Sequence, residues 1–169
     1  MPTQERIERD LTMTILMTPD MANFAGNVHG GLILKYLDQV AYTCASRFTR
    51  QYMVTASVDQ VRFHSPVHIG DLVTLLASVN YTGRSSLEVG IRVETEDVTT
   101  GVRRHTNSCY FTMVALGEDG RPCEVRQVAP RTDEEHRRWS DALRRRAARE
   151  SSQRPVDHSS RPLRSPGCR

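Results

Sequence analysis

The sequence lacks any apolar run of the roughly 20 residues that a membrane-spanning helix needs. Residues 1–10 are charged and contain no apolar core of the kind found in secretion signals. The four cysteines show neither close pairing nor zinc-ligand spacing, which disfavours a disulfide framework and a zinc site. We therefore expect a cytoplasmic protein that has no membrane partner and no bound metal.

Lysine is almost absent, because Lys35 is the only one and arginine supplies nearly all of the positive charge. The formal net charge of +3 is too small to indicate a nucleic-acid partner, and much of the excess lies in the last third of the chain. Apolar residues make up 38% of the 169 residues, which is enough for one globular core. We expect one domain over residues 1–150, followed by a disordered Ser-, Pro- and Arg-rich tail over 151–169.

Hydrophobic periodicity predicts an α+β protein with an early helix, long strands and a C-terminal helix. The expected strands cover residues 11–17, 52–63, 71–81, 85–96 and 102–116, and the expected helices cover 31–48 and 132–150. In the turn at residues 81–85, Gly83 is expected to supply a positive φ. Thr132 and Glu135 have the spacing of a capping box, and Arg144, Arg145 and Arg146 are expected to form a solvated face of the second helix.

The helix at residues 31–48 has an unusually wide apolar arc. This arc contains Ile33, Leu34, Leu37, Val40, Ala41, Cys44, Ala45 and Phe48. Because so wide an arc exceeds what one packed face of a surface helix needs, we expect a curved antiparallel sheet to wrap around the helix. Edge-to-edge pairing with a second copy would cover the remaining apolar surface.

Asp38 lies at the margin of that arc, where a carboxylate is expected to be partly desolvated. The alternative is a solvated acid at the helix boundary. The preceding segment, Ala22 to Gly31, brings glycines to the helix start, where a ligand carbonyl could approach free backbone N–H groups. Asn23 adds a neutral side-chain donor, and a simple turn into the helix is the competing interpretation.

These residues resemble the signature of the hotdog-fold acyl-CoA thioesterases. The spacing Asn23-x-x-Gly26-x-x-x-Gly30-Gly31, followed by Asp38, fits that family. The later stretches TASVDQVRF, PVHIGD, GRSSLEV and FTMVAL follow in the family's order. The resemblance covers roughly residues 10–148 and implies a hotdog fold, with a long central helix wrapped by a curved antiparallel sheet.

The resemblance also implies the site. Asn23 and Asp38 are the expected catalytic pair, with the Asn from one subunit facing the Asp of the other. The expected smallest unit is a homodimer, and a hexamer (a trimer of dimers) is the larger assembly left open. Gly31, with Gly30 and His29 beside it, is expected to meet the thioester at the helix start. The turn formed by Gly83, Arg84, Ser85 and Ser86 is expected near the bound CoA, although a plain hairpin explains it equally well.

Thioester hydrolysis suits these residue types, because the carbonyl is already electrophilic and needs only an activated nucleophile and oxyanion stabilisation. Asp38 would be a general base for water, or would attack directly to form an anhydride; the sequence leaves both routes open. Asn23 would orient the substrate or the water. No separate cofactor is expected, since CoA is part of the acyl-CoA substrate. Pro66 between His64 and His68 disfavours a metal site there.

Other functions remain as alternatives. A hotdog enoyl thioester hydratase would need a catalytic His, and none lies near Asp38 in the helix. A non-catalytic acyl-CoA-binding regulator would not need to keep both Asn23 and Asp38. A protein that only builds an oligomer would leave the spacing of these residues unexplained.

Overall fold

The computed structural model describes residues 8–59 and 61–152. It contains five strands, two α-helices and a short 3-10 helix at Pro19–Met21. The strands are β1 (Asp10–Leu16), β2 (Tyr52–Val58), β3 (Asp71–Thr82), β4 (Ser86–Asp97) and β5 (Arg103–Leu116), and the helices are α1 (Gly30–Thr49) and α2 (Asp133–Ser152). Every predicted element is present.

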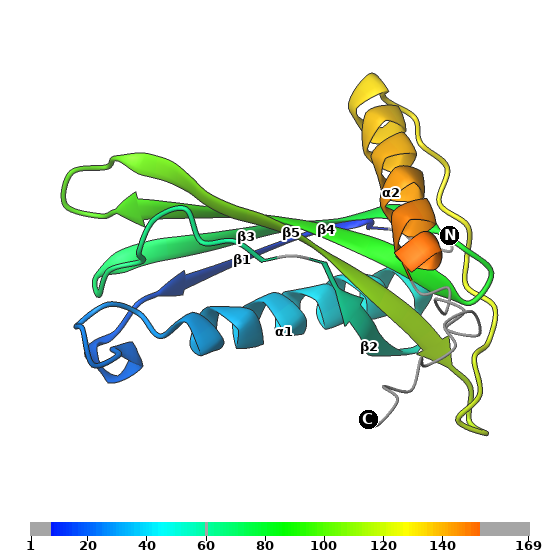
Figure 1. Cartoon of the computed structure of the whole chain (residues 1–169), viewed down its shortest axis with the longest axis horizontal. Helices are drawn as coiled ribbons and strands as arrows, with labels where there is room; N and C mark the ends of the chain where they lie inside the picture. The colour runs from blue at the N-terminus through cyan, green and yellow to red at the C-terminus, as the bar shows by residue number, and fades with distance from the viewer. Residues whose placement is uncertain (1–7, 60, 153–169) are drawn as a thin grey trace, which may run out of the picture.

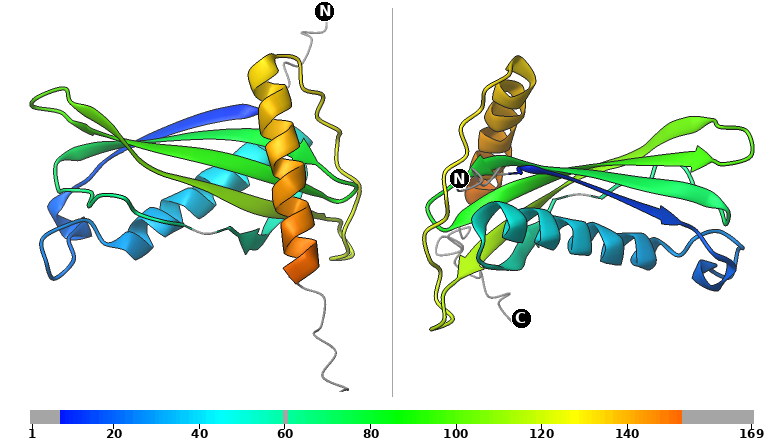
Figure 2. Two further views of the ribbon diagram at one scale, coloured as in Figure 1. Left: turned by 45° about the horizontal axis from the view of Figure 1, so that its top comes forward. Right: turned by 180° about the vertical axis from the view of Figure 1, so that it is seen from behind.

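The strands form one antiparallel sheet in the order β1-β3-β4-β5-β2, so β1 and β2 are its edges. Register shifts interrupt the pairing between Val79 and Tyr81 and between Thr55 and Ser57. Such bulges bend strands and increase their twist. Helix α1 runs along one face of the curved sheet, and α2 crosses the opposite face near one end (Figures 1 and 2).

The core fills the space between α1 and the inner face of the sheet. Alternate residues of the three central strands point inward: Val73, Leu75, Ala77 and Val79; Leu87, Val89, Ile91 and Val93; and Cys109, Phe111, Met113 and Ala115. Seven α1 residues meet them, which confirms the predicted arc except for Leu34, whose side chain is 41% exposed. The sheet does not reach around to Leu34.

Strand β2 is shorter than predicted, because regular pairing ends at Val58 rather than at residue 63. The chain still follows β5 at two points, where Asp59 N donates to Tyr110 O and His64 N donates to Thr106 O. Pro66, which has no N–H to donate, belongs to the irregular segment that returns the chain to β3.

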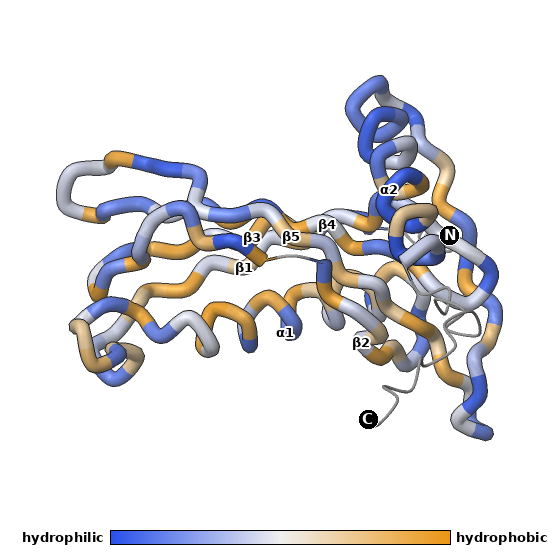
Figure 3. Tube along the Cα trace, viewed as in Figure 1, coloured by the Kyte–Doolittle hydropathy of each residue, from blue (hydrophilic) through white to orange (hydrophobic). Residues whose placement is uncertain are grey.

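Helix α2 begins with the predicted capping box. Glu135 N donates to Thr132 Oγ1 (3.2 Å), and Glu135 Oε2 accepts from Thr132 N (3.4 Å). The helix is strongly hydrophilic (Figure 3). The prediction of a solvated arginine face is wrong for Arg145, which bonds to the buried Glu88 and lies 3.5 Å from the Tyr110 ring centroid.

The predicted tail boundary is also placed too early, because Ser151 and Ser152 still belong to α2. Residues 153–169 lie outside the described residues. No helix in the described ranges has both the length and the apolar character needed to span a bilayer.

Candidate active site

Asp38 is held by a partner that the sequence reasoning missed. Thr55 Oγ1, on edge strand β2, donates a hydrogen bond to Asp38 Oδ1 at 2.6 Å and lies 3.5 Å from Met113 Sδ. The side chain of Thr55 points to the inner face because its register partner is Met113. Thr55 opens the TASVDQVRF stretch, so its place in that motif was the available signal.

Asp38 lies on an exposed face of α1. Leu34 and Tyr42 are one helical turn before and after it, and each is 41% exposed. Tyr42 contacts the Tyr52 ring of β2 at a centroid distance of 6.3 Å. In the single chain the carboxylate is therefore accessible, and the expected partial desolvation needs a further covering surface. An apolar face beside an unpaired edge strand is suited to such a cover.

The Asn23 side chain orders its own loop. Its Oδ1 accepts from the backbone N–H of Ala25 (2.9 Å) and of Asn27 (3.1 Å). Gly26, with φ of +80°, allows the tight turn between them. Among the described residues Asn23 Nδ2 donates no hydrogen bond, so the amide N–H groups remain available for a ligand.

His29 caps α1: its Nδ1 accepts a hydrogen bond from Gly31 N at 3.2 Å. The N–H group expected to meet the thioester carbonyl is thus already engaged by a side chain, and a substrate carbonyl would have to share or replace that contact. Asp38 lies eight residues beyond Gly30, about 12 Å further along the helix axis. Since the Asn23 loop precedes α1, this separation does not favour pairing Asn23 with Asp38 of the same chain.

The turn at Gly83–Ser86 lies elsewhere. Ser86 pairs with Val114 of β5, which in turn pairs with Val54 of β2, so the turn is two strands away from the Thr55 region. Ser86 belongs to the sheet face under α2, opposite to Asp38. The single chain does not bring this turn and Asp38 together.

The predicted positive φ at Gly83 is wrong. The backbone φ angle of Gly83 is not positive. A Cβ at this position would instead lie 2.7 Å from Arg146 Nη1 and 3.3 Å from Ser86 Oγ. A larger residue at this position would require the Arg146 guanidinium, at the end of a flexible side chain of α2, to move aside.

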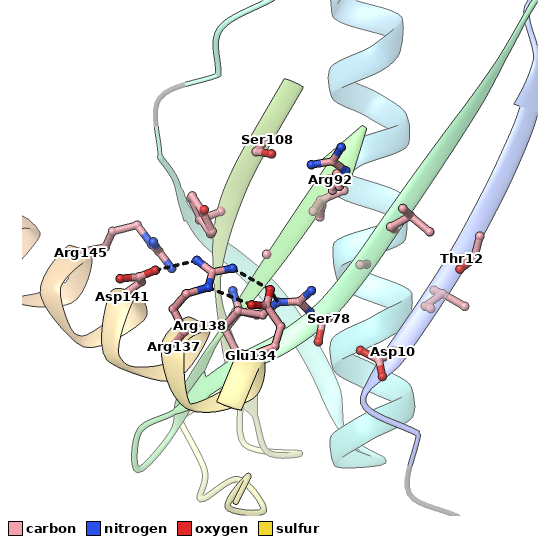
Figure 4. Close-up of a pocket in the computed structure, with 17 residues that line it drawn as sticks. Asp10, Thr12, Ser78, Arg92, Ser108, Glu134, Arg137, Arg138, Asp141 and Arg145 are labelled. Atoms are coloured by element: carbon pink, nitrogen blue, oxygen red, sulfur yellow. Dashed lines mark hydrogen bonds and ion pairs between the residues drawn. The ribbon is translucent and has the colours of Figure 1, made fainter. Parts of the chain in front are cut away.

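The outer face of the sheet carries a cavity of about 500 Å³ beneath α2 (Figure 4). Its arginines are already paired: Arg137 with Glu134 and Asp141, and Arg138 with Glu134. The sheet separates this cavity from Asp38, so the cavity does not belong to the Asp38 site.

Neither a cysteine nucleophile nor a metal site is supported by the described residues. Burial raises the pKa of the Cys44 and Cys109 thiols to about 12, so neither is a ready nucleophile. No cluster of three or more His, Cys, Asp or Glu side chains suited to a metal ion is found within residues 8–59 and 61–152.

The long helix against a curved antiparallel sheet, with a carboxylate on the helix next to an edge strand, defines a hotdog-type fold and site. The family model described as the thioesterase superfamily matches residues 25–102. A hexameric acyl-CoA thioesterase is 38% identical, with a TM-score of 0.82, covering 86% of this chain and 94% of that one. The chain therefore belongs to the hotdog-fold acyl-CoA thioesterases, as the sequence predicted, and is an enzyme of that class.

Two other similar proteins add detail. Protein VdlD of Helicobacter pylori is 48% identical over 139 residues, covering 82% of this chain and 79% of its own length. The acyl-CoA hydrolase of Staphylococcus aureus, solved with butyryl-CoA and CoA, is 29% identical, with a TM-score of 0.80 and coverages of 86% and 89%. Solved variants of that hydrolase replace an asparagine, an aspartate 15 residues later, and a threonine 17 residues after that by alanine. Asn23, Asp38 and Thr55 have the same spacing.

Proposed function

We propose that this protein hydrolyses acyl-CoA to a free fatty acid and CoA, with Asp38 as the reacting carboxylate. The observation that carries the proposal is the hydrogen bond from Thr55 to Asp38 on the exposed face of α1. It holds one carboxylate oxygen, while no residue within the described ranges donates a hydrogen bond to Oδ2, which can therefore face a substrate. The matching spacing in the S. aureus hydrolase supports the same three positions.

As a general base, Asp38 takes a proton from water while the water oxygen bonds to the thioester carbon. When the tetrahedral intermediate collapses, the C–S bond breaks and Asp38 transfers the proton to the departing CoA thiolate. As a nucleophile, the carboxylate would displace CoA to form an anhydride, which water then hydrolyses. Both routes place negative charge on the former carbonyl oxygen. The N-terminal amides of α1 and Asn23 Nδ2 are the donors suited to stabilise this charge.

We further propose that Asn23 reaches Asp38 of a second copy, which makes a homodimer the smallest active unit. The axial separation along α1, the exposed Leu34 and Tyr42, and the open edge of β2 support this arrangement. The hexameric relatives support a trimer of such dimers.

The remaining roles follow the same reasoning. His29, Gly30 and Gly31 would border the thioester, and the exposed Arg84 with Gly83, Ser85 and Ser86 would meet the CoA moiety through a guanidinium and hydroxyl groups. No separate cofactor is needed, because the reaction consumes only acyl-CoA and water. We expect the enzyme to work in the cytoplasm.

The experiment is a thiol-release assay on acyl-CoAs of several chain lengths with wild-type protein, two site variants and one control variant. We expect Asp38→Asn and Asn23→Ala to lower kcat at least about a hundredfold, since removal of one preorganised oxyanion donor alone typically costs that much. Gln39→Glu, on the same exposed helix and next to Asp38, is the control and should retain activity. Full activity in Asp38→Asn would contradict the proposal.

A further inference from the structure

The PVHIGD stretch contains a buried carboxylate that the proposed reaction does not use. Asp71, at the start of β3, is 5% exposed. Its Oδ2 accepts from Arg104 Nη2 of β5 (2.7 Å) and from the backbone N–H of His68 (2.9 Å). Arg104 also lies 3.1 Å from His68 Nδ1 and donates through Nε to Thr95 Oγ1 at 2.9 Å. The Arg104–Asp71 ion pair therefore fixes the main chain at His68.

That main chain in turn holds the loop of Asn23. Val28 N donates to Val67 O (2.9 Å), and Asn27 forms an isolated antiparallel bridge with His68. Asn27 N then donates to Asn23 Oδ1 (3.1 Å), while Asn23 N donates to Asn27 O (2.7 Å). A continuous series of contacts thus connects the Arg104 guanidinium to the Asn23 carboxamide.

The other end of the loop is fastened to the same place. Met17 N donates to Asp71 O (2.9 Å), and Met17 O accepts from Gly70 N (2.8 Å). Gly70 adopts φ of +91°, which a residue with a Cβ rarely does, so glycine at this position permits the turn that makes the contact with Met17. Both ends of the segment 17–28 are therefore anchored on residues 67–71, and Asn23 lies between them.

We propose that the Arg104–Asp71 ion pair positions Asn23, acting through His68 and Asn27 to hold the carboxamide where its N–H groups meet the substrate. The inference rests on the proposed role of Asn23 and adds two positioning residues to it. Arg104 and Asp71 do not touch the thioester themselves. A buried carboxylate requires a charged partner, so removing the Arg104 guanidinium releases the very segment to which the loop is attached.

The main test is Arg104→Gln in the thiol-release assay. A displacement of a catalytic group by about 1 Å can cost up to a hundredfold in rate, so we expect kcat to fall by about ten- to a hundredfold with little change in KM. Arg104→Lys should restore part of the loss, because it keeps the charge on Asp71. Arg103→Gln is the matched control: it removes the neighbouring Arg103–Glu96 pair (2.6 Å) and should leave kcat unchanged.

A double-mutant cycle shows whether the effect passes through Asn23. In the Asn23→Ala background, Arg104→Gln should have almost no further effect on kcat, because the group that it positions is gone. If the kcat of the double variant instead falls by the product of the two single losses, the two residues act independently. That result would overturn the inference and indicate that Arg104→Gln perturbs the structure as a whole. Hydrogen exchange supplies a readout that does not depend on activity: amides 25 and 27 should exchange faster in Arg104→Gln and normally in Arg103→Gln.

Failure of this inference is distinct from failure of the proposed function. If Asn23→Ala is inactive while Arg104→Gln has normal kcat and normal exchange at amides 25 and 27, only the positioning role is wrong. If Asn23→Ala retains full activity, the proposed role of Asn23 fails. Asp71→Asn gives a second entry into the network, and a folded Asp71→Asn protein with normal kcat would also overturn the inference.

Discussion

At the scale of single residues, the hydrogen bond from Thr55 restricts the orientation of the Asp38 carboxylate. Thr55 Oγ1 donates to Asp38 Oδ1, so Oδ1 has a donor and the range of orientations open to the carboxylate is narrowed. Both proposed routes need Asp38 to present its other oxygen in a reproducible direction, towards a water molecule or a carbonyl carbon. Thr55 is therefore a positioning residue for Asp38.

Thr55→Val keeps the β-branched shape and removes the donor. A hydrogen bond to a charged group contributes about 1.5–3 kcal/mol, so we expect kcat to fall about 10- to 100-fold. Thr55→Ser restores the hydroxyl and should recover most of the rate. Steady-state kinetics on the three proteins checks this, and an unchanged kcat in Thr55→Val would show that the bond has no role in orienting Asp38.

At the scale of an element, α2 depends on its first turn. Glu135 accepts from the backbone N–H of Arg131 (2.6 Å), forms the capping box with Thr132 and pairs with Arg9 at 2.9 Å. These contacts lower the pKa of Glu135, with the backbone bond from Arg131 as the largest cause. The helix thereby fastens its N-terminal end to the residue that precedes β1.

The lowered pKa predicts a pH dependence. Because the folded pKa lies below the unfolded value of about 4.3, the stabilisation is present above that pH and is lost as the pH falls through the folded pKa. Glu135→Gln should therefore lower the thermal midpoint at pH 7 and have less effect in acid. Asp133→Asn changes the charge at the same helix end without touching the capping box, so it is the control. An equal deficit of Glu135→Gln at both pH values would contradict the mechanism.

At the scale of the whole molecule, the single chain leaves its site open. Asp38 and Thr55 lie on an exposed face next to the β2 edge, while Asn23 lies before the start of α1. A second copy that pairs along this edge would cover Leu34 and Tyr42 and bring its own Asn23 loop. Dimerisation and catalysis would then be the same structural event.

Subunit mixing tests this arrangement. A mixed dimer of Asn23→Ala and Asp38→Asn chains keeps one intact Asn23–Asp38 pair only if the pair spans two subunits. Co-expression in equal amounts makes about half of the dimers mixed, so about a quarter of the wild-type activity should return. Mixing Asn23→Ala with the Asn23→Ala/Asp38→Asn double variant leaves no intact pair and should return none. An inactive first mixture would place the pair within one chain.

Most of the fold could be read from the sequence, because strand and helix periodicities are local and strong in this chain. The arc of α1, the strand alternation and the capping box at Thr132 and Glu135 were all predictable. Leu34 was not, since its exposure depends on how far the sheet curls around the helix. Arg145 was not either, since only the crossing of α2 over the sheet brings it to Glu88.

The site residues likewise fall into those that the sequence predicted and those that only the folded structure revealed. Spacing and resemblance selected Asn23 and Asp38 as candidates, because those residues belong to one continuous stretch of chain. The hydrogen bond of Thr55 to Asp38 and the ion pair of Asp71 with Arg104 join segments that are distant in sequence. Local preference carries no information about such pairings. They are decided by strand register and by the packing of α1, which exist only in the folded chain.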